Sequence, residues 1–260
     1  VAIGHSALAT QNYGTATNAF NVAVGHEAGA AVTTGINNTL IGALAGDAIT
    51  DADENIAVGH NALTANTIGS KSVAIGGHAL YSQNPSTAVN MFNTAVGNDA
   101  GIAVTIGINN TFVGAQAGDG TDDGVENTAI GANSLSANCG NGNAAVGHAA
   151  LIACTGAFNT AMGVSAGGNV TSGSNNLAIG KDAGITGSPG GNIVTGSNEL
   201  ALGDENIASA SIQVDWTVAS DQRDKTDFTA LDLGLDFVKA LAPVTYKWDK
   251  RSKYGDKTAD

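Results

Sequence analysis

Short apolar segments recur along the first two hundred residues, and each of them ends in a glycine. The usual segment is apolar–Ala–apolar–Gly, as in residues 22–25 (VAVG) and 73–76 (VAIG). The glycines are Gly4, Gly25, Gly59, Gly76, Gly97, Gly131, Gly147, Gly163, Gly180 and Gly203, with Gly42 and Gly114 ending two variants. Successive glycines lie 16 to 23 residues apart, most often 17. A fixed period of this kind indicates a repeat architecture.

A period near 17 residues is too short for the common helical repeats of about 33–47 residues. It suits one coil of a parallel β-solenoid, and we predict about 12 coils over residues 1–207, each with two short strands and two turns. The small alanine fits a narrow interior, and the glycine allows a turn or close stacking of coils. Asn and Thr before each strand suit turns and side-chain ladders. A larger repeat of 72 residues aligns Phe20-Asn21 with Phe92-Asn93.

Composition narrows the possible functions. Aromatic residues make up 5% of the chain, charged residues 13%, and 36 of 260 residues are glycine. A conventional enzyme core built on Leu and Phe is therefore not expected, and the β-branched content argues against disorder. The net charge is −13, and residues 1–215 contain only Lys71 and Lys181 as basic residues, which argues against a nucleic-acid partner. No apolar run approaches 18 residues, so we expect no membrane insertion.

The composition changes near residues 207–219, and we place a domain boundary there. Residues 216–260 hold eight basic and eight acidic residues and both tryptophans. We predict a small α+β segment over 208–260: a strand at 212–218, an amphipathic helix through Leu231 to Leu241 that Pro243 ends, and a strand at 244–248. Because the chain opens within a repeat, we expect it to be a fragment.

The repeat region resembles the head repeats of trimeric autotransporter adhesins and related repeats of phage tail fibres. The matching segments are residues 127–131 (NTAIG) and 159–163 (NTAMG), and the resemblance covers about residues 1–206. It implies an all-β fold, a repetitive parallel β-solenoid or β-roll packed as a homotrimer. It is specific for architecture and says little about function.

The C-terminal region resembles the intramolecular chaperone auto-processing domain of phage tail fibres and tailspikes. Three segments carry the resemblance in order: residues 220–225 (SDQRDK), 233–235 (LGL) and 241–246 (LAPVTY). Residues 227–228 (DF) stand where the family usually has Asn-Ile, and the family domain normally extends further. Residues 208–260 would thus be the N-terminal part of such a domain.

The resemblance implies one self-cleavage, between Ala219 and Ser220. Ser220 would be the nucleophile and Lys225 its base, and Asp221 and Arg223 complete the motif. A serine hydroxyl needs a base to take its proton, and a lysine can be that base where burial lowers its pKa. The chain would thus be at most a single-turnover Ser/Lys endopeptidase, and no turnover activity is expected of the repeats.

We therefore expect a structural and adhesive viral tail fibre, made in the host cytoplasm and carried on the virion tail. Its expected partners are two further copies of itself, a host cell-surface glycan or protein receptor, and other tail proteins toward the N-terminus. Tyr13 and Tyr81, in the longer inserts near 9–18 and 81–90, are candidates for stacking on a sugar. The alternatives are a bacterial trimeric surface adhesin head and a tailspike that cleaves glycans.

Other candidate features receive plainer interpretations, and we expect no metal and no cofactor. His5, His26, His60 and His148 follow the repeat glycine directly; a stacked column that binds a metal is possible, but an exposed slot is favoured. For Cys139 and Cys154, two buried free thiols are favoured over a disulfide. For the acidic clusters at 51–54 and 119–123, solvated loops are favoured over calcium sites.

Overall fold

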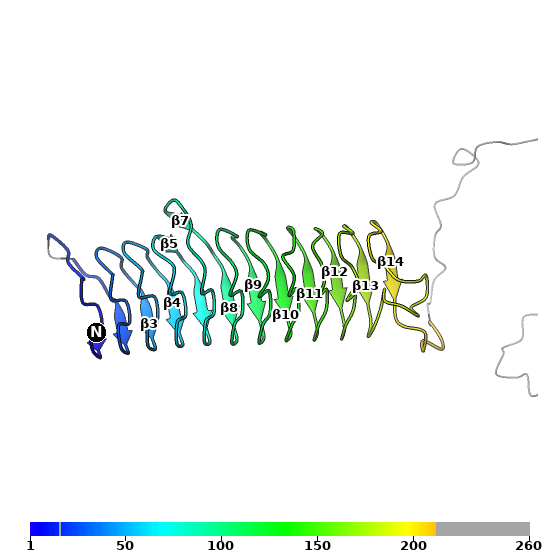
Figure 1. Ribbon diagram of the computed structural model, residues 1–260, viewed down its shortest axis with the longest axis horizontal. Coiled ribbons are helices and arrows are strands. Elements are labelled where there is room, and N and C mark those ends of the chain that lie inside the picture. Colours follow the sequence, from blue (N-terminus) through cyan, green and yellow to red (C-terminus); the bar gives the residue numbers. More distant parts are fainter. Residues whose placement is uncertain (16, 212–260) are drawn as a thin grey trace, which may run out of the picture. The chain divides into compact units, whose positions relative to one another are not determined.

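The protein is described by a computed structural model, which covers residues 1–15 and 17–211. These residues are all-β with no helix, and they form a parallel β-solenoid whose coils stack in chain order (Figure 1). One 12-stranded sheet runs along it. Its strands are β1 (Ala2–Ile3), β2 (Val22–Val24), β3 (Thr39–Ile41), β4 (Ile56–Val58), β6 (Val73–Ile75), β8 (Thr94–Val96), β9 (Thr111–Val113), β10 (Thr128–Ile130), β11 (Ala144–Val146), β12 (Thr160–Met162), β13 (Leu177–Ile179) and β14 (Leu200–Leu202). The predicted solenoid is therefore confirmed.

The prediction of two strands in every coil was wrong. Each coil of the described part contributes one strand to the long sheet, and a second pair forms only between β5 (Gly69–Ser70) and β7 (Val89–Asn90). Turns make up the rest of each coil. The predicted strands at 212–218 and 244–248 and the helix between them lie outside the described residues. Among residues 1–15 and 17–211 no helix is present that could cross a membrane.

The strands pair in a register that places equivalent residues side by side. Ala129 of β10 pairs with Phe112 of β9 and with Ala145 of β11. The central residue of each three-residue strand is buried, whereas the residues on either side of it point outward. This is the two-residue alternation of a strand with one face in the core. The repeat spacing therefore determines which side chains form continuous columns.

The glycine that follows each strand is required by both conformation and space. Gly97 has φ +145° and Gly114 has φ +137°, values that L side chains rarely adopt. A Cβ on Gly97 would lie 2.3 Å from the carbonyl oxygen of Gly114, which occupies the same place in the next coil. The expected role of this glycine in turning the chain and stacking the coils is confirmed.

Larger core residues are accommodated by glycines on neighbouring turns. Leu40 and Phe112 take the central strand position that alanine holds elsewhere, and both are fully buried. A Cβ on Gly101 or Gly118 would lie 2.8 Å or 2.5 Å from the ring of Phe112. Other coils place a leucine at that turn position and an alanine in the strand, so volume is conserved along the narrow core.

Buried asparagines form a ladder just before the strands. Oδ1 of Asn110 accepts a hydrogen bond from the backbone N–H of Asn127 at 2.9 Å, and its Nδ2 donates to the carbonyl of Gly124 at 2.9 Å. The ladder contains Asn21, Asn38, Asn55, Asn93, Asn110, Asn127, Asn143, Asn159 and Asn176. Each amide therefore satisfies buried backbone groups that no strand ladder reaches.

One position of the ladder holds a serine, and a glutamine substitutes for the missing amide. Gln83 is fully buried, and its Nε2 lies 3.1 Å from Oγ of Ser72. Oε1 of Gln83 accepts a hydrogen bond of 3.0 Å from Nδ2 of Asn93, the next ladder residue. Gln83 belongs to the longer insert near 81–90, which therefore completes the core at that coil.

Candidate functional site

The residues predicted to cleave the chain lie outside the described part. Ser220, Lys225, Ala219, Asp221 and Arg223 all follow residue 211, where the description ends. Their roles stay predictions from the sequence. The features below belong to residues 1–15 and 17–211, where no pocket is found.

An unbroken apolar stripe runs along the sheet. It is formed by the third residue of each three-residue strand and by the last residue of β1, and none of its side chains is buried. Its members are Ile3, Val24, Ile41, Val58, Ile75, Val96, Val113, Ile130, Val146, Met162, Ile179 and Leu202. Every member is apolar, although each lies on the outer face of the sheet. Soluble monomers rarely expose continuous apolar surfaces of this kind, which mark interaction sites.

The neighbouring outward column is less apolar. It contains the first residue of each three-residue strand, and five of these are threonines, among them Thr94 and Thr128. The contrast is informative because both columns face outward from the same strands. Solvent exposure alone would permit threonine in either column, so it does not account for the restriction of the stripe to apolar residues.

Three exposed phenylalanines occupy the same position in three coils, each four coils from the next, and the sequence interpretation missed them as a candidate site. Phe20, Phe92 and Phe158 are 72%, 52% and 62% exposed, and their φ angles are +50°, +51° and +58°. This left-handed conformation is unusual for a bulky side chain. Equivalent positions in other coils hold residues that tolerate it better, such as Asn109 and Gly142. Glu54 and Lys71 also adopt it at this position, so the coil sets the conformation and the exposed ring is what distinguishes the three phenylalanines.

The rings of Phe92 and Phe158 lie over the preceding coil. Nζ of Lys71 lies 5.7 Å from the centre of the Phe92 ring. A Cβ on Gly142 would lie 2.7 Å from Cδ1 of Phe158, so the ring packs where that glycine has no side chain. The sequence signal for these phenylalanines was the recurring Phe-Asn pair, which the 72-residue repeat gives for Phe20 and Phe92.

The two tyrosines proposed for sugar stacking have different surroundings. Tyr13 is half-buried, and its hydroxyl donates to the carbonyl of Gly35 at 2.6 Å and accepts from Nδ2 of Asn21 at 3.1 Å. Burial raises the pKa of the Tyr13 hydroxyl. Tyr81 is 39% exposed and meets the ring of His78 edge-on. The geometry thus gives Tyr13 a structural role and leaves Tyr81 available at the surface.

The four histidines that follow a repeat glycine are exposed, as favoured from the sequence. They do not form one continuous column: His5 and His26 stack, whereas His60 meets the fifth histidine, His78, edge-on. Nδ1 of His78 lies 3.1 Å from Oδ1 of Asp99 in the next coil. His148 has no histidine in the equivalent slot of either adjacent coil.

Cys139 and Cys154 are free and buried, so the prediction of two buried thiols is confirmed. Burial raises the pKa of the Cys154 thiol to about 11 and also raises that of Cys139. Sγ of Cys139 lies 3.2 Å from Oγ1 of Thr121, and Nδ2 of Asn159 donates to Sγ of Cys154 at 3.3 Å. These thiols pack the core and are poor nucleophiles.

Carboxylates of the two acidic clusters form hydrogen bonds, some of them between coils. Oδ1 of Asp53 accepts from the backbone N–H of Ile36 at 2.8 Å, and Asp122 accepts from the hydroxyl of Thr105. Asp51 accepts from the hydroxyl of the adjacent Thr50 at 2.6 Å. These hydrogen bonds account for the positions of the three carboxylates in their loops.

Comparison with known families gave one match, in the C-terminal region. Residues 220–259 match the family described as chaperone of endosialidase. Comparison with curated proteins and with solved structures gave no match. The match and the β-solenoid together fit a tailspike-like or fibre-like protein with an intramolecular chaperone segment.

Proposed function

We propose that the chain is part of a homotrimeric phage tail fibre that attaches to a host surface. The apolar stripe carries this proposal, because it extends through every strand of the 12-stranded sheet. A column whose members are all apolar is best explained by burial against the same column in other copies. The chaperone match at residues 220–259 supports it, since such a segment belongs to proteins that assemble as fibres or spikes.

Self-association would complete the burial that a single coil cannot provide. Each coil buries a few small side chains, with alanine at most central strand positions. A second layer of apolar contacts along the stripe would add stability in proportion to the area removed from water. Because equivalent residues are stacked along the sheet, three copies in the same register would bring like residues together at every coil.

The substitution Ile130→Lys in the full chain tests the stripe. Ile130 is 41% exposed on β10, and a lysine there would place a charge inside the proposed interface. The matched control is Ile106→Lys, because Ile106 is 55% exposed but lies outside the strands. Light scattering coupled to size exclusion should give a trimer for the wild type and the control, and a smaller species for Ile130→Lys. A monomeric wild type, or a trimeric Ile130→Lys, would refute this interface.

The host-binding part of the proposal rests on the exposed phenylalanines. An aromatic face can stack on a sugar ring, and the following coils supply Asn37 after Phe20 and Asn109 after Phe92 at the equivalent position. A host surface glycan is therefore the proposed receptor. Replacing Phe20, Phe92 and Phe158 with asparagine, which suits the left-handed conformation, should abolish binding to host cells while leaving the trimer intact. Unchanged binding would place the receptor site elsewhere.

Self-cleavage at Ala219–Ser220 is the third part of the proposal. The hydroxyl of Ser220 would attack the carbonyl of Ala219 while Lys225 takes the hydroxyl proton. The C–N bond between Ala219 and Ser220 would break, and the freed amine of Ser220 would take that proton. Water would then hydrolyse the ester between Ala219 and Ser220, which releases the N-terminal fibre and restores the hydroxyl. Intact mass under denaturing conditions, with and without Ser220→Ala, tests this step. Loss of residues 220 onward in the wild type alone would support it. An uncut trimeric wild type would mean that the chaperone segment is retained.

A further inference from the structure

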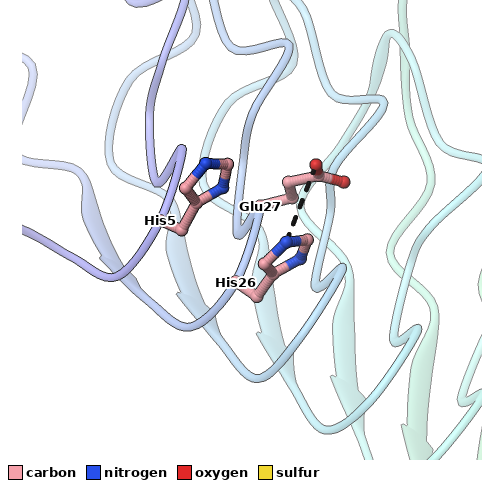
Figure 2. Close-up of side chains that lie close together, drawn as sticks. All are labelled: His5, His26 and Glu27. Carbon is pink, nitrogen blue, oxygen red and sulfur yellow. Dashed lines mark ion pairs between the residues drawn. The ribbon is translucent and has the colours of Figure 1, made fainter.

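The first two coils bring together three side chains that can bind a metal. His5, His26 and Glu27 each offer one ligand atom, and these atoms all lie within 4.8 Å of one another. The imidazole rings of His5 and His26 are stacked, with centroids 5.2 Å apart and planes 12° apart. Nε2 of His26 lies 3.9 Å from Oε1 of Glu27. Figure 2 shows the three side chains grouped on the turns that follow the strands.

The strand register explains why these residues meet. β1 and β2 pair with Ile3 opposite Val24, so the next two residues of each coil, through His5 and His26, continue side by side. The backbone N–H of Glu27 donates to the carbonyl of His5 at 2.8 Å, which ties the second turn to the first. The rigid sheet thus fixes the backbone from which all three ligands extend.

The environment favours a cation. The described residues contain only two basic residues, Lys71 and Lys181, and both belong to coils further along the chain. Two stacked imidazoles would repel each other if both were protonated, whereas a bound cation would be attracted by two neutral rings and one carboxylate. Within the described residues no hydrogen bond joins the two rings, so their nitrogens are not paired with each other.

Ser6 contacts one of the two ring nitrogens of His5. Its Oγ lies 3.1 Å from Nδ1 of His5. A metal-bound histidine usually donates its other ring N–H to an oxygen, which orients the ring. With Nδ1–H donating to Ser6, Nε2 of His5 is the available ligand, and Nε2 of His26 is the atom nearest to Glu27.

We propose that His5, His26 and Glu27 bind a divalent transition-metal ion, with water completing the coordination. Two imidazoles and one carboxylate form a donor set that suits Zn²⁺, Ni²⁺ and Cu²⁺. Tetrahedral bonds of about 2.0–2.2 Å place donor atoms about 3.3 Å apart. The ligand atoms must therefore approach by about an ångström or more, and rotation of exposed side chains allows this movement. The site is independent of the proposed attachment function.

The other histidines supply a matched control. His148 occupies the same exposed slot after a repeat glycine, but the adjacent coils place Ala132 and Val164 there. Within the residues that the structure covers, His5, His26 and Glu27 are the one group of three possible ligands. The chain's 5 histidines all lie within the described part, so this comparison includes each of them.

Calorimetric titration of Zn²⁺ into the full chain tests the proposal. The protein should be purified without a histidine tag and treated with a chelator. One ion per chain is expected for the wild type and for His148→Asn, and His26→Asn and Glu27→Gln should each weaken binding by about tenfold or more. Circular dichroism of each variant establishes that the fold is retained.

Three outcomes would overturn the proposal. The first is a wild type that shows no saturable binding of Zn²⁺. The second is binding that His26→Asn leaves unchanged, which would place the ion elsewhere. The third is equal weakening by His148→Asn and His26→Asn, which would indicate non-specific binding to exposed histidines.

Discussion

Replacing one amide of the asparagine ladder provides a strict test of what holds the coils together. In Asn110→Ala, the backbone N–H of Asn127 loses its acceptor and the carbonyl of Gly124 loses its donor. Both groups belong to buried residues. Each buried polar group left without a partner costs about 1–3 kcal/mol, so the free energy of unfolding should fall by about 2–6 kcal/mol. The backbone N–H of residue 110 itself keeps its hydrogen bond to Oδ1 of Asn93 in this variant.

The assay is urea unfolding of the full chain followed by circular dichroism, with the slope of the transition compared between variants. The matched control is Asn109→Gly, because Asn109 is exposed with φ +60° and Gly142 holds the equivalent position in another coil. That change should shift stability by no more than about 0.5 kcal/mol. If Asn110→Ala is as stable as the control, the ladder does not supply the proposed stabilisation.

Three further predictions follow from the core. Gly114→Ala should prevent native stacking, because its Cβ would lie 2.6 Å from the carbonyl carbon of Gly131; a thermal melt checks this, and a native-like transition would contradict it. Cys139 and Cys154 should not react with a thiol reagent at pH 8, where raised pKa values keep both protonated, and both should react after unfolding; rapid native labelling would contradict their burial. Gln83→Ala should lower the free energy of unfolding by about 1–3 kcal/mol, as measured by urea unfolding.

The repeat could be predicted from the sequence because its spacing has a direct physical meaning. A glycine every 16 to 23 residues, most often 17, after an apolar triplet predicts stacked coils, and the structure places Gly97 against Gly114 as expected. The buried alanine and the exposed histidine slots followed from the same register. The stacked coils, the buried alanine and the exposed histidine slots depend only on residue type and period, which can be read directly from the sequence.

Other features depend on conformations that residue type does not reveal. The second strand of each coil was predicted, but turns and bonds such as Asn110 to Gly124 replace it. The three exposed phenylalanines were missed because residues such as Phe92 adopt a left-handed conformation that favours asparagine or glycine. The stacking of His5 on His26 was considered from their shared place after the repeat glycine, whereas the approach of Glu27 to His26 depends on side-chain positions that the period does not provide.

The number of coils sets the length of the solenoid, because each coil pairs only with its neighbours. Each strand of the long sheet pairs only with the strands before and after it. Removing or duplicating a 72-residue block, from Gly25 to Gly97 for example, would join surfaces of the same shape. The length would then change by about 19 Å, four coils of about 4.8 Å each. Recombination between the repeats would thus change the length of the solenoid without a change in its core.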